Sequence, residues 1–325
     1  MRWRMGRTFH QRLRDLEARE CWTADQYKSY QDARLRELVH HAYQNVPYYG
    51  QLFDRLKLTP GDIQTVADLQ KIPILKKDML REAPEQFIAR NVPQSQQVQV
   101  STSGTSGRNV RLVSHASDEY LYGGPFEWRF YRSGGYEPGD RCAVFRAHYV
   151  PSDPSQIYEF NPAQNKVSFS IFHLNRENLP RYVEGVEKYR PRIFNAYISF
   201  LFEWVQLMTA QRIKAPVQPK AIFTIGELVT DDQRKRVEDF FSAPILDWYG
   251  MEERVVIAAQ CQVREGHHLV MDYGITELLP ENNKHSSQAK RIIATGLTNF
   301  ACPLIRYDTE DLAVAIDEPC DCGRM

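Results

Sequence analysis

The sequence predicts a layered α/β fold. Strand-like runs alternate with helical runs along most of the chain beyond residue 96, which is typical of a mixed or parallel sheet covered by helices. Hydrophobic residues make up 42% of the 325 residues, and charged residues make up 25%. This composition is ordinary for a globular protein with a large core, and the length suits one large or two ordinary domains.

The first 95 residues are expected to form a helical N-terminal flank. Residues 24–45 predict a helix that Pro47 closes, because apolar residues recur there at helical spacing. Residues 66–92 predict short helical pieces, because prolines interrupt them. The apolar residues of the first helix and the interrupting prolines are Leu35, Leu38, Val39 and Ala42, and Pro73, Pro84 and Pro93.

Residues 96–325 are expected to form the α/β core. Its strands are predicted at residues 98–102, 142–146, 192–196, 221–225, 245–249 and 291–295. Its helices are predicted at residues 179–189, 200–211 and 231–241. The part from about 254 to 317 is rich in strand-forming residues and predicts a second sheet or a small barrel.

Charge and hydropathy exclude several classes of protein. Lys plus Arg and Asp plus Glu both number 41, so the chain lacks the basic excess of a dedicated nucleic-acid binder. No apolar stretch approaches the roughly 20 residues that span a bilayer, and no signal peptide is evident. We therefore expect a cytoplasmic protein without membrane insertion, with its six cysteines reduced. A homodimer is a candidate assembly.

The most informative segment is a loop rich in hydroxyl groups and glycine. Glycines let the backbone approach a ligand closely, successive N–H groups form an anion nest, and an arginine can bind phosphate with two hydrogen bonds. The spacing of a Walker A loop is absent. The loop therefore predicts phosphate binding, with a flexible polar surface loop as the alternative. Its residues are Ser101, Thr102, Ser103, Gly104, Thr105, Ser106, Gly107 and Arg108.

Four ordered motifs resemble those of the adenylate-forming (AMP-producing) acyl ligases. They are the loop at 101–108, the segment FTIGE at 223–227, YGMEE at 249–253 and PLIRYDTED at 303–311. The segments at 45–49 and 69–74 are similar to the phenylacetate–CoA ligase branch, which includes CapK-like relatives of capsular polysaccharide synthesis. The likeness covers about residues 30 to 324. It implies the layered α/β large N-terminal domain of these enzymes, with a β-rich C-terminal part.

The resemblance also implies an activity and its site. ATP would activate a carboxylic acid, with an aryl acid as one candidate, to an acyl-adenylate, and the acyl group would pass to CoA or an acyl-carrier thiol. Glu253 would bind Mg²⁺, and Arg108 would bind the phosphates. Tyr249 would stack on adenine and Asp311 would bind the ribose hydroxyls. The remaining residues implied for ATP or AMP are Gly226, Glu227, Gly250 and Met251.

The chain departs from the family pattern at several positions. Arg108 replaces the usual lysine, and Glu252 replaces a threonine that contacts the α-phosphate. Asp308 and Glu310 replace arginine and glycine. Family members continue into a small C-terminal lid domain, which is missing from this sequence, so we expect nucleotide binding to exceed turnover. The alternatives are a nucleotide-binding or scaffold protein with little ligase activity, and an unrelated phosphate-binding α/β protein.

Two further sets of residues are candidates. Cys261, His268, Cys320 and Cys322 form a donor set suited to a structural Zn²⁺ site, and the resembled branch often carries one. The competing ligand is His267, and buried reduced thiols are the alternative to a metal. His148 after one strand, and Tyr197 and Ser199 after another, are candidates for the acyl pocket.

Overall fold

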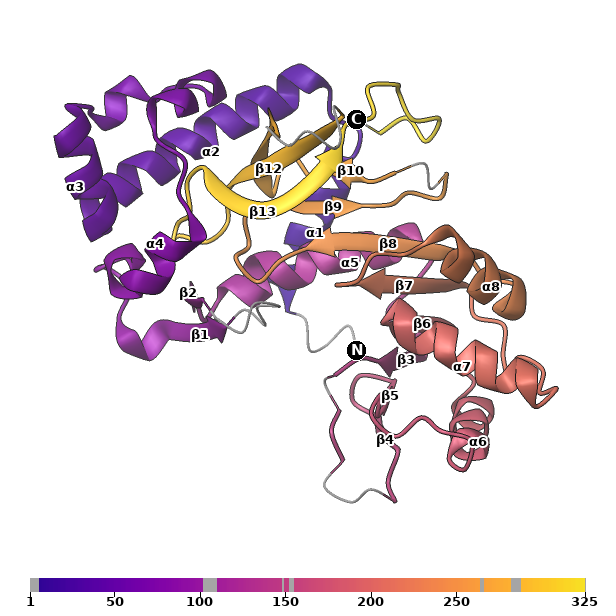
Figure 1. Ribbon diagram of the computed structural model, residues 1–325. Helices are drawn as coiled ribbons and strands as arrows, with labels where there is room; N and C mark the ends of the chain where they lie inside the picture. Colours follow the sequence, from indigo (N-terminus) through magenta and orange to yellow (C-terminus); the bar gives the residue numbers. More distant parts are fainter. Residues whose placement is uncertain are drawn as a thin grey trace. The chain divides into compact units, whose positions relative to one another are not determined.

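The computed structural model describes residues 6–101, 110–147, 149–151, 155–263, 266–281 and 288–324 (Figure 1). Its α-helices are α1 (Arg7–Arg19), α2 (Ala24–Asn45), α3 (Pro47–Leu56), α4 (Lys77–Glu82), α5 (Gly124–Ser133), α6 (Leu179–Tyr189), α7 (Ile198–Ala210) and α8 (Asp231–Phe241). Its strands are β1 (Gln97–Ser101), β2 (Arg111–His115), β3 (Cys142–Phe145), β4 (Tyr158–Asn161), β5 (Lys166–Phe169), β6 (Ile193–Ala196), β7 (Ala221–Ile225), β8 (Ile245–Gly250), β9 (Ile257–Ala259), β10 (His268–Leu269), β11 (Gly274–Pro280), β12 (Ala289–Gly296) and β13 (Tyr307–Val314).

The chain folds into two compact units, and the α/β fold class is confirmed. The first unit contains residues 1–13, 126–249 and 259–267. The second contains residues 14–125, 250–258 and 268–325. Each unit is thus built from segments that are distant in the sequence. The division into a flank of 95 residues and a core stays a prediction.

A mostly parallel sheet organises the first unit. Its strands lie in the order β8-β7-β6-β3-β5-β4, which Figure 1 shows from β8 down to β4. The strands β8, β7, β6, β3 and β5 run parallel, and β4 pairs antiparallel with β5 at the edge. Because these strands share one direction, the residues that follow β3, β6 and β7 lie together along the carboxyl ends of the strands.

Both faces of this sheet are buried, because apolar side chains point to each face in turn. Val144 on β3 and Ile193 on β6 pack with α5 residues such as Trp128. Their neighbours Phe145 and Phe194 pack on the opposite side with residues of α6, α7 and α8, among them Trp204. Two hydrophobic cores therefore hold the strand ends in place.

Local sequence signals define the limits of α8. Thr230 accepts a hydrogen bond from the backbone N–H of Gln233, and the Gln233 side chain accepts from the Thr230 backbone, which forms a capping box. Asp231 and Asp232 stand in the first turn, where negative charge favours the helix dipole. The helix ends at Ser242, which adopts φ 51°.

The second unit combines helices with small antiparallel sheets. Strands β11, β12 and β13 form an open three-stranded sheet, and β1 pairs with β2. The β-rich part predicted at 254–317 is thus an open sheet and not a barrel. Apolar residues of α2 and α3, such as Leu38 and Phe53, pack with Ile275 of β11 and Ile305 near β13.

A short segment before α4 docks onto the start of β13. Leu75 forms an isolated parallel bridge with Tyr307. The Leu75 N–H donates to the Arg306 carbonyl at 2.9 Å, and the Asp308 N–H donates to the Leu75 carbonyl at 2.9 Å. The buried Arg306 guanidinium binds both oxygens of Glu277, at 2.8 and 2.9 Å, and the Ile72 carbonyl at 2.6 Å. These bonds fix where α4 begins.

Among the described residues, no helix is long and apolar enough to cross a membrane.

Candidate active site

The predicted phosphate loop connects β1 and β2. The register pairs Ser101 with Arg111, so the two strands lead directly into and out of the loop. Thr102, Ser103, Gly104, Thr105, Ser106, Gly107 and Arg108 lie outside the described residues, as does His148. Their assignment to phosphate and acid binding stays a prediction.

Glu253 is a buried carboxylate in the second unit. It follows β8 by three residues and is 6% exposed. The Tyr307 hydroxyl donates to Glu253 Oε1 at 3.0 Å, and the Lys77 Nζ lies 3.6 Å from the same oxygen. A buried carboxylate requires this kind of compensation, because water no longer solvates it. Carboxylate oxygen is also a ligand that Mg²⁺ prefers, so the chemistry of Glu253 fits the ion.

Lys77 is a member of this cluster that the sequence patterns do not identify. It is the first residue of α4, with a side chain 16% exposed, and it also lies 4.0 Å from Glu310. The docking of Leu75 on Tyr307 brings it there. The signal in the sequence is weak, because lysines such as Lys76 and Lys77 are mostly solvent-exposed in folded proteins.

The environment of Tyr307 is apolar and negatively charged. Burial and the neighbouring Glu253 raise the pKa of the Tyr307 hydroxyl well above its usual range. The hydroxyl therefore stays protonated and serves as a hydrogen-bond donor. A permanent donor and an ammonium group together hold Glu253 in one position.

Asp311, expected to bind ribose, lies in an irregular part of β13. The register shifts between Arg291 and Ile293 of β12, where the partner residues change from Leu312 to Asp308. The extra residues form a bulge, with Glu310 at φ 66°. Asp311 is exposed there, and its N–H donates to the Thr309 hydroxyl at 3.1 Å.

Asp308, which stands where the resembled family has arginine, stabilises this bulge. Its carboxylate pairs with the Arg291 guanidinium and accepts the Glu310 N–H at 3.1 Å. The departure from the family pattern thus has a local structural role. Glu252, the other acidic departure, is exposed, and Gly250 and Met251 beside it are half-buried.

Gly226 and Glu227 follow β7 in the first unit. Gly226 adopts φ 80°, a conformation that favours glycine. The Glu227 carboxylate accepts the Ser199 N–H at 2.9 Å and the Ser199 hydroxyl at 2.7 Å. Ser199 lies in the first turn of α7, whose preceding residue Tyr197 provides no side-chain cap. Glu227 therefore supplies the missing cap.

Asp247 of β8 orders the polar residues near the end of the same sheet. It accepts the Thr224 hydroxyl at 2.6 Å, and the His267 Nε2 lies 2.9 Å from its other oxygen. His267, the competing metal ligand, is thus engaged with a carboxylate. Tyr249, expected to stack on adenine, is half-buried two residues further along β8.

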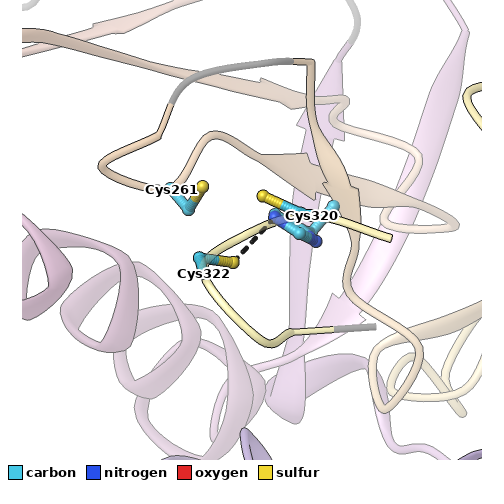
Figure 2. Close-up of side chains that lie close together, drawn as sticks. Cys261, Cys320 and Cys322 are labelled. Carbon is cyan, nitrogen blue, oxygen red and sulfur yellow. Dashed lines mark hydrogen bonds between the residues drawn. The ribbon is translucent and has the colours of Figure 1, made fainter. Parts of the chain in front are cut away.

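Four side chains with metal-binding atoms gather near the end of the chain. Figure 2 shows the thiols of Cys261, Cys320 and Cys322 close together. With His268, they offer ligand atoms that all lie within 4.8 Å of one another. The Cys322 Sγ lies 3.3 Å from the His268 Nε2, and only six residues separate Cys261 from His268 in the chain.

The geometry of this cluster fits Zn²⁺. Three sulfurs and one imidazole nitrogen are a closed structural donor set for the ion. A Zn–S bond of about 2.3 Å implies a spacing of about 3.8 Å between the corners of the tetrahedron. The donors lie within 4.8 Å of one another, at most about 1 Å beyond this spacing. The zinc assignment itself stays a prediction.

Comparison with known proteins extends these observations. No protein-family model matches the chain. The chain is 22% identical over 313 residues to protein CapK of Staphylococcus aureus, covering 96% of this chain and 67% of CapK. It is 25% identical over 318 residues to the phenylacetate–coenzyme A ligase of Thermus thermophilus, covering 94% of this chain and 69% of that enzyme.

A solved structure shares the fold. The open conformation of 2-hydroxyisobutyryl-CoA ligase, in complex with 2-HIB-AMP and CoA, superimposes with a TM-score of 0.74. The sequence identity is 19%, and the match covers 94% of this chain and 74% of that one. The fold is therefore that of an adenylate-forming ligase. The sequence similarities confirm the resemblance to the phenylacetate–CoA ligase and CapK branch.

Proposed function

We propose that the chain is an AMP-forming acid–thiol ligase. It activates a carboxylic acid with ATP to an acyl-adenylate and passes the acyl group to CoA or a carrier thiol. The observation that carries the proposal is the buried Glu253 carboxylate, which follows the Tyr249-Gly250 pair in a chain with the ligase fold. The similarity to phenylacetate–CoA ligases over more than nine-tenths of the chain supports it.

The chemistry explains why such a carboxylate is needed. An acid anion must attack the α-phosphorus of ATP, which is itself negatively charged. Bound Mg²⁺ supplies positive charge that stabilises the transition state. In this proposal Glu253 holds the ion, with Tyr307 orienting the carboxylate and Lys77 balancing its charge before the ion binds.

The nucleotide-binding roles are those that the resemblance implies. Tyr249 stacks on adenine beside Gly226 and Glu227, and Asp311 accepts the ribose hydroxyls. The loop at 101–108 binds the phosphates. The zinc cluster serves structure and takes no part in the reaction. Six cysteines are too sparse for a disulfide scaffold, which favours the cytoplasm as the compartment.

Acid-dependent exchange of pyrophosphate into ATP tests this function. Exchange is expected with ATP, Mg²⁺ and a suitable acid, and the Glu253→Gln and Asp311→Ala variants are expected to lose most of it. Glu318→Ala is the matched control, since Glu318 is an exposed acid outside the proposed site. Unchanged exchange in both site variants would refute the assignment.

The alternative, a nucleotide-binding or scaffold protein, gives a different result. It requires calorimetric binding of ATP or AMP without exchange for any acid of a broad panel, or no nucleotide binding at all. The exposed Glu252 is the feature that favours this alternative, because a second carboxylate near the phosphates repels them.

A further inference from the structure

Arg146 and Tyr197 lie together at the carboxyl edge of the parallel sheet in the first unit. Arg146 directly follows β3, and Tyr197 directly follows the neighbouring strand β6. The Tyr197 N–H donates to the Phe145 carbonyl at 3.0 Å, which continues the pairing of these strands. Ligands of open α/β sheets bind at this edge.

The Arg146 guanidinium has unused hydrogen-bonding capacity. Its central carbon lies 5.8 Å from the centre of the Tyr197 ring, so an aromatic side chain holds the charged group. The Nε atom is buried and has no hydrogen-bond partner among the described residues. A buried donor without a partner is unfavourable, and a bound ligand, water or ion is one way to satisfy it.

The polar neighbours below Arg146 are already paired with one another. The Tyr131 hydroxyl donates to Glu127 and accepts from the amide of Asn195. Burial and Glu127 raise the pKa of Tyr131 well above its usual range, while the positive charge of Arg146 acts in the opposite direction. Arg146 is therefore close to the Tyr131 hydroxyl, but the hydrogen bonds of that hydroxyl are made with Glu127 and Asn195.

The position of Arg146 separates it from the nucleotide. Gly226, which the proposed function places beside adenine, follows β7, and β6 lies between β7 and β3. Two strand spacings of about 4.8 Å put the end of β3 roughly 10 Å from the end of β7. A group bound by Arg146 is thus separate from the adenine, and we assign it to the acid.

We propose that Arg146 binds a second anionic group of the acid substrate, so that the enzyme activates dianionic acids. A planar guanidinium matches a carboxylate or a phosphate through two parallel hydrogen bonds. The inference rests on the proposed function for the other carboxylate, the one that reacts with ATP. It makes Arg146 a residue that determines specificity.

Calorimetric titration of the full chain with matched acids tests the inference. The pairs are hexanoate and adipate, and phenylacetate and 4-carboxyphenylacetate, with 6-phosphonohexanoate to distinguish phosphate from carboxylate recognition. Each dianionic acid is expected to bind at least about tenfold more tightly than its monoanionic partner. Arg146→Met is expected to weaken dianion binding about 10- to 100-fold and to leave monoanion binding unchanged.

Two further variants separate the effect of the planar guanidinium at position 146 from the effect of charge alone and from the loss of any arginine. Arg146→Lys retains the charge without the planar fork, so an intermediate loss is expected. Arg192→Met is the matched control, because Arg192 lies at the amino end of β6 and pairs with Asp140 at 2.9 Å. Equal binding of dianions and monoanions, or an equal loss in the Arg192 and Arg146 variants, overturns the inference.

Pyrophosphate exchange with the same acids separates this inference from the proposed function. Exchange with monoanions only, unaffected by Arg146→Met, overturns the inference and leaves the ligase function intact. Binding of dianions that depends on Arg146, without exchange for any acid, supports the inference and overturns the function. A higher KM for dianions in Arg146→Met, with kcat unchanged, supports both.

Discussion

Replacing Lys77 by methionine tests whether Glu253 is held as a charged group that awaits a cation. Methionine has a similar length and no charge, so the change removes the ammonium and little else. It leaves a carboxylate that is 6% exposed with the Tyr307 hydroxyl as its remaining described donor. A buried charge that loses its partner is strongly destabilising.

The distance sets the size of the effect. At 3.6 Å, and with an effective dielectric constant of about 20, two unit charges attract each other by about 5 kcal/mol. Part of this gain is offset because the Lys77 ammonium loses water, and its side chain keeps 16% exposure, which screens the pair. We expect Lys77→Met to lower the free energy of unfolding by about 2–4 kcal/mol.

Urea unfolding with and without Mg²⁺ measures this loss. Excess Mg²⁺ is expected to restore part of the stability, because the ion replaces the missing positive charge. The double variant Lys77→Met/Glu253→Gln is expected to be more stable than Lys77→Met, because no buried charge remains. Lys76→Met is the control, since Lys76 is the exposed neighbour of Lys77.

Two results would refute the reasoning. Equal unfolding midpoints for Lys77→Met and Lys76→Met would mean that the ion pair contributes nothing. Additive effects of Lys77→Met and Glu253→Gln would mean that the two side chains are not coupled.

Three other predictions follow from the structure. Glu227→Gln removes the charge that caps α7 and is expected to cost about 1 kcal/mol of unfolding free energy in urea, whereas an unchanged midpoint contradicts the capping role. Burial raises the pKa of the Cys142 and Cys302 thiols from 9.0 to about 12. Their folded pKa values exceed the unfolded ones, so their contribution to stability is complete below about pH 9 and is lost as the pH rises from 9 towards 12. A urea unfolding midpoint that stays constant up to pH 11 in both wild type and a Cys142→Ala/Cys302→Ala variant contradicts this. Cys322→Ser is expected to lower the zinc content measured by mass spectrometry well below one ion per chain, with the exposed Cys21→Ser as the control; wild-type protein without zinc after growth with added zinc argues against the site.

Local sequence signals predict much of the fold. The limits expected for α2, α6 and α8 agree with the structure, because caps and helical spacing of apolar residues are properties of neighbouring residues. The strand pattern does not single out β4 and β5, which have four residues each. The strands β3 and β6 are equally short but buried throughout, whereas β4 and β5 are only partly buried and lack a continuous apolar run.

Long-range contacts explain what the sequence leaves undetermined in the candidate site. The motif at 249–253 points to Glu253, but the approach of Lys77 depends on the docking of Leu75 against Tyr307. The choice between two adjacent histidines also depends on tertiary structure. Asp247 engages His267, and His268 faces the cysteines.

The bridge between Leu75 and Tyr307 also has a consequence for the order of folding during synthesis. The first unit consists mostly of one continuous segment, residues 126–249, whereas the second needs strands that the ribosome produces after that segment. At 5–20 residues per second, roughly 10 to 50 seconds separate the synthesis of Leu75 from that of Tyr307. During this interval α2 and α3 expose the apolar faces that later cover Ile275 and Ile305. The N-terminal helices are therefore where a nascent chain is most open to chaperone binding.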